Sequence, residues 1–280
     1  MQIEFTKMHG LGNDFVVIDA INQDVAVTDI QVRFIADRHF GIGCDQLLLV
    51  ERPTLAGAEF RYRIYNADGG EVQQCGNGAR CFARFVHDRG MTQSKSIPVE
   101  TTAGMIYLIL EADGQVTVDM GVPSFEPESL PFEADDLLQD ETEYHQLMVN
   151  GKKYAIGAVS VGNPHAVLLV DSVDKAPVLT LGAAIENHER FPERVNVGFM
   201  EIMDRSHVRL RVYERGAGET LACGTGACAA VAVGIHNSLL DSPAEVALKG
   251  GKLTIRWAGN GNPLFMTGPA QTVYEGKITL

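Results

Sequence analysis

An internal repeat, offset by 148 residues, is the feature that most restricts how this chain folds. Segment 61–79 aligns without gaps on 209–227, and nine of the nineteen aligned positions are identical, where composition alone gives about one or two. An offset of 150 also aligns 12–13 with 162–163. Both offsets are close to half of the 280 residues. We therefore predict two copies of one domain.

The strands of each copy are predicted from alternation. In segment 59–66, the apolar and aromatic residues Phe60, Tyr62 and Ile64 stand at every second position, and segment 207–214 has the same pattern. Apolar and aromatic side chains at every second position are typical of a half-buried antiparallel strand. Further strands are expected at 3–7, 15–19, 46–51, 105–111 and 115–120 in the first copy, and at 154–161, 166–170, 195–202 and 252–257 in the second.

A helix is expected after each copy of a Cys-Gly-x-Gly motif. The first helix is predicted at 79–89, ended by Gly90, and the second at 227–236. The second is apolar on nearly every side, which is typical of a helix enclosed by other elements. The prediction is an α+β fold of two pseudo-symmetric domains, each a curved antiparallel sheet wrapped around a central helix.

The domain boundaries are placed by composition. We predict one domain at 1–123 and a second at 124–269, with a C-terminal strand at 270–280 that returns to the first. The segment 126–143 is rich in acidic residues, which favours an exposed crossover into the second domain.

The charge and the cysteines restrict partners and compartment. The net charge is −13, from 23 basic and 36 acidic residues, so nucleic acid and anionic membranes would be repelled. No apolar run approaches the ~20 residues of a membrane span, and the N-terminus has no secretory pattern. Five cysteines, an odd number at low density, are typical of a reduced compartment. We expect a cytoplasmic protein that binds neither nucleic acid nor membrane.

The repeated motif, Cys75-Gly-Asn-Gly and Cys223-Gly-Thr-Gly, is predicted to lie where a turn enters a helix. Free N–H groups and the positive end of the helix dipole at such a position bind a carboxylate or a developing oxyanion. The same field is expected to lower the pKa of the adjacent thiol from ~8.5 toward neutrality. A tight turn with a buried thiol is the structural alternative, and the equivalent second copy makes it less convincing.

Two thiols on opposite faces of one carbon are what a racemase or epimerase needs. A thiolate removes the proton from one face while a thiol delivers a proton to the other, and converging helix N-termini stabilise the charge that forms. The other common route to a labile Cα–H bond is a pyridoxal Schiff base on a lysine. None of the lysines stands in a context that suggests one, so no cofactor and no metal are expected.

The chain resembles the diaminopimelate epimerase family, cofactor-independent enzymes that interconvert LL- and meso-diaminopimelate in bacterial lysine and cell-wall synthesis. The likeness covers the whole length and is specific because many motifs occur in the same order. They are the segments 5–15, 41–46, 66–69, 75–81, 162–165, 195–197, 214–220 and 223–226.

The resemblance implies roles for individual residues and a homodimer. Cys75 and Cys223 would be the acid/base pair, with Cys75 taking the proton from the LL isomer. The backbone N–H groups that hold the α-carboxylate would be those of Gly76, Asn77, Gly224 and Thr225. The distal carboxylate would contact Asn66, Asn196 and Arg215. The distal ammonium and the orientation of the substrate would be fixed by Asn13, Asn163 and Glu214, and Gln46 would line the pocket.

Other interpretations remain open at this point. A proline or hydroxyproline racemase, or a phenazine-type isomerase, would use the same scaffold. A zinc or thiol-redox module is a different class, although Cys-x5-Cys and Cys-x4-Cys spacings suit neither well. A catalytically inactive binding protein is a third. Structural roles are favoured for Glu71 and Glu219, and a core position is at least as reasonable as a site role for His165. Packing is expected for Cys81 and Cys228, and Cys44 receives no role.

Overall fold

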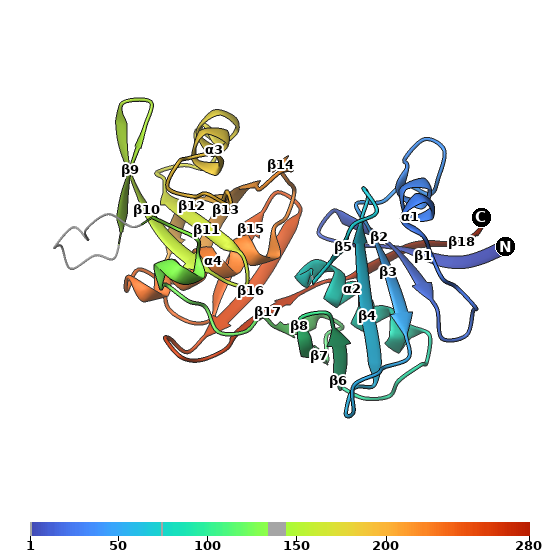
Figure 1. Cartoon of the computed structure of the whole chain (residues 1–280). Coiled ribbons are helices and arrows are strands. Elements are labelled where there is room, and N and C mark those ends of the chain that lie inside the picture. Colours follow the sequence, from blue (N-terminus) through green and yellow to red (C-terminus); the bar gives the residue numbers. More distant parts are fainter. Residues whose placement is uncertain (1, 74, 134–143) are drawn as a thin grey trace. The chain divides into compact units, whose positions relative to one another are not determined.

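The computed structural model describes residues 2–73, 75–133 and 144–280 (Figure 1). The chain divides into two compact units. Unit 1 is Met1–Asp119 with Thr267–Leu280, and unit 2 is Met120–Met266. The boundaries predicted from the sequence, after residues 123 and 269, fall a few residues beyond these.

Unit 1 is one sheet with two helices. Its elements are β1 (Gln2–Gly10), β2 (Asn13–Asp19), α1 (Asp29–Ala36), β3 (Gln46–Glu51), β4 (Phe60–Asn66), β5 (Glu71–Val72), α2 (Gly76–Asp88), β6 (Ser96–Thr101), β7 (Gly104–Leu110), β8 (Val116–Asp119) and β18 (Gln271–Thr279). The strands pair in the order β18-β1-β2-β3-β4-β6-β7-β8, and β5 pairs with β4.

Unit 2 repeats this arrangement. Its elements are η1 (Pro127–Ser129), β9 (His145–Val149), β10 (Lys152–Ser160), β11 (Pro164–Leu169), α3 (Val178–Glu186), β12 (Asn196–Asp204), β13 (His207–Glu214), β14 (Gly218–Glu219), α4 (Gly224–His236), β15 (Ala244–Leu248), β16 (Gly251–Trp257) and β17 (Leu264–Gly268), which runs across the boundary to unit 1. The pairing order is β9-β10-β11-β12-β13-β15-β16, with β14 on β13.

The register shows the duplication residue by residue. Phe15 on β2 pairs with Gln46 on β3, and 150 positions later His165 on β11 pairs with Asn196 on β12. The strand at the outer edge is the exception. The partner of β1 is β18, from the C-terminal end, whereas the equivalent partner of β10 is β9, which directly precedes it.

The α+β class is confirmed, but the sheets are mixed and not purely antiparallel. The pairs β2–β3 and β4–β6 are parallel in unit 1, as are β11–β12 and β13–β15 in unit 2. Parallel neighbours need a long crossover connection, usually a helix. Each of the four crossovers contains one of the helices α1 to α4. Each unit therefore has two crossovers and two parallel pairs.

In each unit one helix packs against several strands of the sheet. Helix α2 contacts β1, β2, β3, β7 and β8, and α4 contacts β10, β11, β12, β13, β15 and β16. Ten of the thirteen residues of α4 are buried. The all-round apolar character of α4 therefore reflects burial against strands on several sides.

Both central helices begin three residues earlier than predicted, at Gly76 and Gly224. Glycine is a poor helix former, so the sequence pattern placed the first turns outside the helices. Packing explains the glycines. A Cβ on Gly78 would lie 2.6 Å from the Tyr62 hydroxyl oxygen, and one on Gly226 would lie 3.0 Å from Val212 Cγ2. The glycines let each helix approach its neighbouring strand.

Two helices, α1 and α3, were not predicted, and the segment after β8 also differs from expectation. Helix α1, which was not predicted, begins with a capping box between Thr28 and Gln31. The segment 126–143 is not simply an exposed crossover, because Leu130 and Phe132 are buried in the core of unit 2. Residues 134–143 of that prediction lie outside the described residues.

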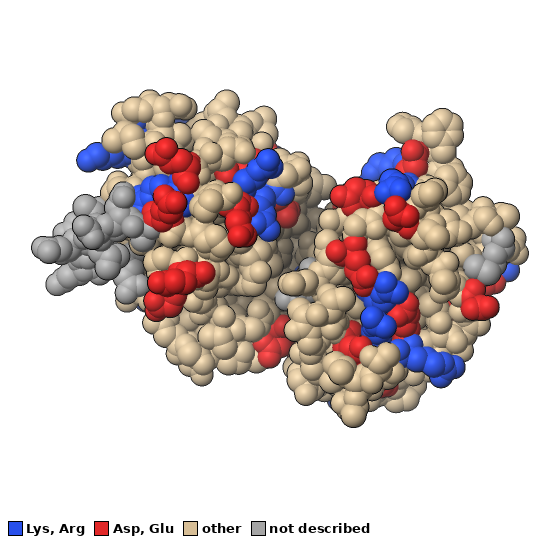
Figure 2. Space-filling model, in the orientation of Figure 1, with Lys and Arg blue, Asp and Glu red and all other residues tan. Residues whose placement is uncertain are grey.

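Many of the arginines are paired with carboxylates. Figure 2 shows basic side chains beside acidic ones on the visible face. Arg63 forms a two-bond ion pair with Glu71, and the repeat-equivalent Arg211 forms the same pair with Glu219. In the described part of the chain, no helix is long and apolar enough to span a membrane.

Candidate active site

Cys75 is the N-cap of α2, with extended backbone (φ −143°, ψ 119°). Among the five cysteines, all of which the structure describes, it alone is not buried. Its Sγ lies 3.7 Å from Asn13 Oδ1, and its carbonyl accepts a hydrogen bond from the Tyr62 hydroxyl (3.3 Å). The thiol thus stands at the N-terminus of a helix with an amide oxygen beside it.

Four predicted residues of unit 1 form two contacting pairs. Asn77, in the first turn of α2, donates from Nδ2 to Asn13 Oδ1 (3.2 Å). Gln46 on β3 donates from Nε2 to Asn66 Oδ1 on β4 (2.9 Å), because the two residues are directly paired in the ladder. Asn66 also takes part in a turn, since its carbonyl accepts from the Gly69 N–H.

Cys223 is the N-cap of α4 and is buried. Its Sγ accepts from the Gly226 N–H (3.3 Å) and lies 3.5 Å from Thr225 Oγ1. Burial, followed by the charge of Glu214, raises the pKa of this thiol well above its ordinary value, although the two hydrogen bonds act in the opposite direction. The expectation of a lowered thiol pKa is therefore wrong for Cys223, because desolvation outweighs the helix terminus.

Asn163 occupies in unit 2 the place that Asn13 has in unit 1. Its Nδ2 lies 3.5 Å from Thr225 Oγ1, and its Oδ1 lies 3.0 Å from His165 Nε2. Burial, helped by the charge of Arg215, lowers the pKa of His165 to about 3. The imidazole is therefore neutral at physiological pH and contacts a predicted site residue.

The remaining predicted residues of unit 2 surround the turn after β13. The Arg215 N–H donates to Asn196 Oδ1 (3.0 Å), while the exposed guanidinium donates to the Glu193 carbonyl (3.0 Å). The carboxylate of Glu214 accepts a hydrogen bond from the Thr220 hydroxyl. A planar cation and a carboxylate thus adjoin each other at the end of one strand.

Several residues outside the predicted set touch the site. Asp45 accepts from Asn13 Nδ2 (2.9 Å) and Arg80 donates to Asn77 Oδ1 (2.9 Å). Both belong to the motif segments 41–46 and 75–81, so the signal was present without a role. Glu71 and Glu219 are engaged by arginines.

The cysteines without a predicted role are fully or nearly fully buried. Desolvation raises the pKa of Cys44 to about 11 and that of Cys81 to about 12. Cys228 lies inside α4 with no exposed surface. These positions agree with packing roles for Cys81 and Cys228.

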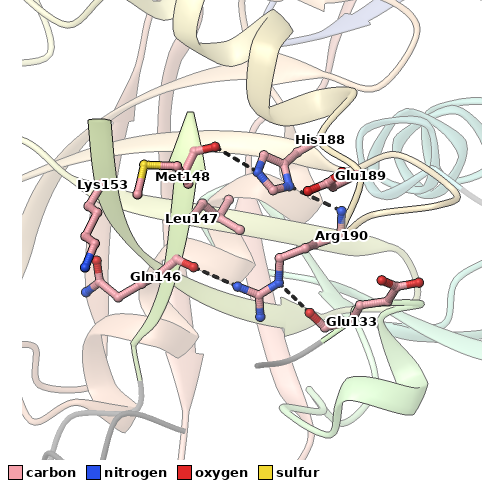
Figure 3. Close-up of a pocket in the computed structure, with 8 residues that line it drawn as sticks. All are labelled: Glu133, Gln146, Leu147, Met148, Lys153, His188, Glu189 and Arg190. Carbon is pink, nitrogen blue, oxygen red and sulfur yellow. Dashed lines mark hydrogen bonds between the residues drawn. The ribbon is translucent and has the colours of Figure 1, made fainter. Parts of the chain in front are cut away.

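Two further features bear on binding chemistry. Among the described residues, no group of three or more His, Cys, Asp or Glu side chains is arranged to hold a metal ion. A surface pocket of unit 2 contains none of the predicted site residues (Figure 3). It is lined by Glu133, Gln146, Leu147, Met148, Lys153, His188, Glu189 and Arg190.

Other solved structures have the same two-unit α+β fold as this chain. The chain is similar to a PhzF-family phenazine biosynthesis protein of Bacillus anthracis, with a TM-score of 0.71 and 18% identity over 100% of both chains. It is also similar to a hydroxyproline epimerase of Agrobacterium vitis, solved with trans-4-hydroxy-L-proline, with a TM-score of 0.69 and 17% identity over 99% of this chain and 92% of the other. These likenesses establish a shared two-unit α+β fold.

Sequence relatives identify the family within that fold. The diaminopimelate epimerase model matches residues 5–126 and 157–273. The chain is 61% identical to the diaminopimelate epimerase of Thioalkalivibrio sulfidiphilus, over 100% of both chains. It is 56% identical to that of Nitrosospira multiformis, over 100% of this chain and 99% of the relative. The chain therefore belongs to the diaminopimelate epimerase family, which confirms the resemblance drawn from its motifs.

Proposed function

We propose that this chain epimerises LL-diaminopimelate to meso-diaminopimelate without a cofactor, in the synthesis of lysine and peptidoglycan precursors. Its family makes it an enzyme of the isomerase class. The observation that carries the proposal is full-length identity of 56% and 61% to proteins named for this activity. The structure adds a cysteine at the N-cap of the central helix in each unit.

The proposed mechanism uses Cys75 and Cys223 on opposite faces of the reacting α-carbon. For the LL isomer, the Cys75 thiolate removes the α-proton, and the Cys223 thiol then delivers its own proton to the other face. One thiolate and one thiol are consumed and one of each is formed, so the reverse reaction starts from the opposite protonation state. The high pKa of Cys223 keeps it protonated, which suits the donor in this direction.

The charge formed on deprotonation needs fixed donors. We propose that the backbone N–H groups of Gly76, Asn77, Gly224 and Thr225, in the first turns of α2 and α4, bind the α-carboxylate. N–H groups in the first turn of a helix point toward its N-terminal end, and the helix dipoles favour an anion at that position. Donors that are already oriented stabilise the enediolate-like intermediate without reorganisation.

The distal end of the substrate carries a carboxylate and an ammonium. Arg215 offers a planar fork that suits a carboxylate, and Glu214, the preceding residue, accepts from an ammonium. We propose that Asn66 and Asn196 join Arg215 on the distal carboxylate. Asn13 and Asn163 join Glu214 in orienting the ammonium, and Gln46 lines the pocket beside Asn66.

We further propose that the protein acts as a homodimer in the cytoplasm. The proposed chemistry requires free thiols, and a reducing compartment keeps them free. Proline-type substrates are disfavoured because they lack a distal amino-acid group for Glu214 and Arg215 to bind. The hydroxyproline epimerase with the same fold is only 17% identical, which supports the fold and not the substrate.

Solvent exchange tests both the mechanism and the substrate. The protein is incubated in D2O with LL-diaminopimelate and, separately, with L-proline, and deuterium at the α-carbon is followed by NMR. We expect deuterium at the inverted carbon of diaminopimelate and none in proline. Inverted diaminopimelate without solvent deuterium would refute the two-thiol mechanism, and turnover of proline alone would refute the substrate.

The two thiols are tested by substitution. Cys75→Ala and Cys223→Ala should each abolish epimerisation, because each removes one of the two proton carriers. Cys81→Ala is the matched control, since Cys81 is buried in the same helix that Cys75 caps. Retention of epimerase activity in either of the first two variants would exclude that cysteine from proton transfer.

A further inference from the structure

A chain of side-chain hydrogen bonds in unit 1 runs past Cys75 and ends on a charged group at each end. The buried Arg80 donates from Nη2 to Asn77 Oδ1 (2.9 Å). Asn77 donates from Nδ2 to Asn13 Oδ1 (3.2 Å), and Asn13 donates from Nδ2 to Asp45 Oδ2 (2.9 Å). These residues come from α2, β2 and the loop before β3, so the run of hydrogen bonds links these three segments.

The charged ends determine the direction of every bond between them. A guanidinium only donates and a carboxylate only accepts. Asn77 must therefore turn its oxygen to Arg80 and its NH2 to Asn13, and Asn13 must turn its NH2 to Asp45. The one orientation left for Asn13 presents Oδ1 to Asn77 and to Cys75 Sγ, which lies 3.7 Å away. Rotating either amide by half a turn would set like groups against each other.

The carboxylate end is held by other charges. Arg38 donates to Asp45 Oδ1 (2.7 Å) and also to both oxygens of Asp14. Asp14 accepts in addition from Lys7 Nζ (2.6 Å). Although burial alone would raise the pKa of Asp14, its bonds to Arg38 and Lys7 hold that pKa far below its ordinary value. Asp45 is therefore fixed in place as a carboxylate partner of an ion cluster.

The repeat has no such charged ends in unit 2. At the aligned positions, Arg80 is replaced by Cys228, Asn77 by Thr225 and Asp45 by Val195, whereas Asn13 is matched by Asn163. A threonine hydroxyl can donate or accept. Asn163 instead contacts the neutral His165. The duplicated asparagines are thus held by different chemistry, and only the one beside Cys75 is fixed by charges at both ends.

We propose that Asp45 and Arg80 are positioning residues that lock the Asn13 amide with its oxygen toward Cys75, so that Asn13 accepts a hydrogen bond from the thiol and favours its protonated form. The assignment of Cys75 to proton transfer rests on the proposed function, but the lock does not. Other titratable groups also face Cys75: Tyr62 from β4 and Cys81 from α2. The nearby guanidinium of Arg80 donates to the Gly76 carbonyl (3.5 Å).

The pH dependence of Cys75 alkylation tests the lock without substrate. Iodoacetamide labelling of Cys75 is measured by peptide mass spectrometry from pH 6 to pH 10, in Asn77→Ala and in Asn77→Ala/Asp45→Ala. Asn77→Ala removes the NH2 group that Arg80 turns to Asn13, and Asp45→Ala then removes the carboxylate at the other end, so Asn13 is free to turn its NH2 to the thiolate. We expect the apparent pKa of Cys75 to be lower by about 0.5–1 unit in the double variant, which corresponds to one hydrogen bond. Asp29→Ala in the Asn77→Ala protein is the matched control, since Asp29 is an exposed partner of Arg33.

A second background separates the lock from the simple loss of a negative charge. When Asn13→Ala is added to both proteins, Asp45→Ala has no amide to release, so the pKa of Cys75 should no longer respond to it. A shift that persists in that background would assign the effect to the charge of Asp45 and overturn the proposal. The same alkylation profile in Asn77→Ala and Asn77→Ala/Asp45→Ala would also overturn it. Both outcomes can be read in a protein that fails to epimerise diaminopimelate, so the two proposals fail separately.

Discussion

The space left by Gly78 is what allows α2 to begin directly after Cys75. In Gly78→Ala, the new Cβ would meet the Tyr62 hydroxyl oxygen at 2.6 Å, with Phe15 Cε1 next at 3.2 Å and Ile64 Cδ1 at 3.4 Å. The first distance is shorter than Cβ atoms tolerate, whereas the contact with Phe15 needs a shift of only a few tenths of an ångström. Removing that oxygen by Tyr62→Phe should therefore rescue the alanine variant.

The expected magnitudes follow from these contacts. Overpacking typically costs about 1–3 kcal/mol, and replacing glycine by alanine in a helix recovers up to about 1 kcal/mol, so Gly78→Ala should destabilise α2 by about 1–2 kcal/mol. Tyr62→Phe loses the 3.3 Å bond to the Cys75 carbonyl, which is worth about 1 kcal/mol. Because the clash is absent from the double variant, it should be more stable than additivity predicts by the full cost of the clash, about 1–3 kcal/mol.

Native-state hydrogen exchange of the α2 amides measures the opening free energy of this helix in all four proteins. The single tryptophan, Trp257, is buried in unit 2, so the unfolding transition seen by its fluorescence serves as a control for effects outside unit 1. Strictly additive free energies in α2 would refute the steric reasoning. So would a Gly78→Ala variant as stable as the wild-type protein.

Two further predictions concern stability. Glu219→Gln should lower the free energy of unfolding by about 2 kcal/mol, and Glu71→Gln by about 1 kcal/mol. The reason is that the Glu219 side chain is 10% exposed and also binds Lys249, whereas that of Glu71 is 30% exposed. Urea unfolding that reverses this order would contradict the reasoning. The pKa of His165 is lowered to about 3 in the folded protein against about 6.5 when unfolded, so below pH 6.5 the unfolded state binds a proton that the folded state does not. Stability should therefore fall from pH 6.5 toward pH 3, and urea midpoints at pH 7 and pH 5 should differ less in His165→Gln than in the wild-type protein.

The parts of the fold that could be predicted are those carried by local pattern. The repeat identified two copies, alternation identified the strands around Tyr62 and Leu210, and an all-round apolar run identified α4. The start of each central helix could not be found in this way, because each helix opens on a glycine, Gly76 or Gly224, and glycine is a poor helix former. Two of the four parallel pairs, β2–β3 and β11–β12, depend on crossovers whose helices, α1 and α3, were not predicted. In α1, Thr28 and Gln31 form a capping box that carried a signal.

The candidate site shows the same division. The position of Cys75 and Cys223 before the helices followed from two glycines and a repeat. The raised pKa of Cys223 did not, because it depends on burial and on Glu214, which β13 and β14 bring to the thiol from nine positions earlier. Asp45 likewise could not be given a role from the sequence, because its hydrogen bond with the Asn13 amide depends on how the loop before β3 lies against β2.

The edge strands of the two units come from different places in the sequence, so the units are completed at different times during synthesis. Unit 2 is continuous, from Met120 to Met266, and its edge strand β9 emerges before the strand it pairs with. Unit 1 must wait for β18, which leaves the ribosome after all of unit 2, so β1 keeps an unpaired edge until then. Although domains usually fold in the order in which they are made, here the second is complete before the first, and a truncation before residue 271 would open only the first.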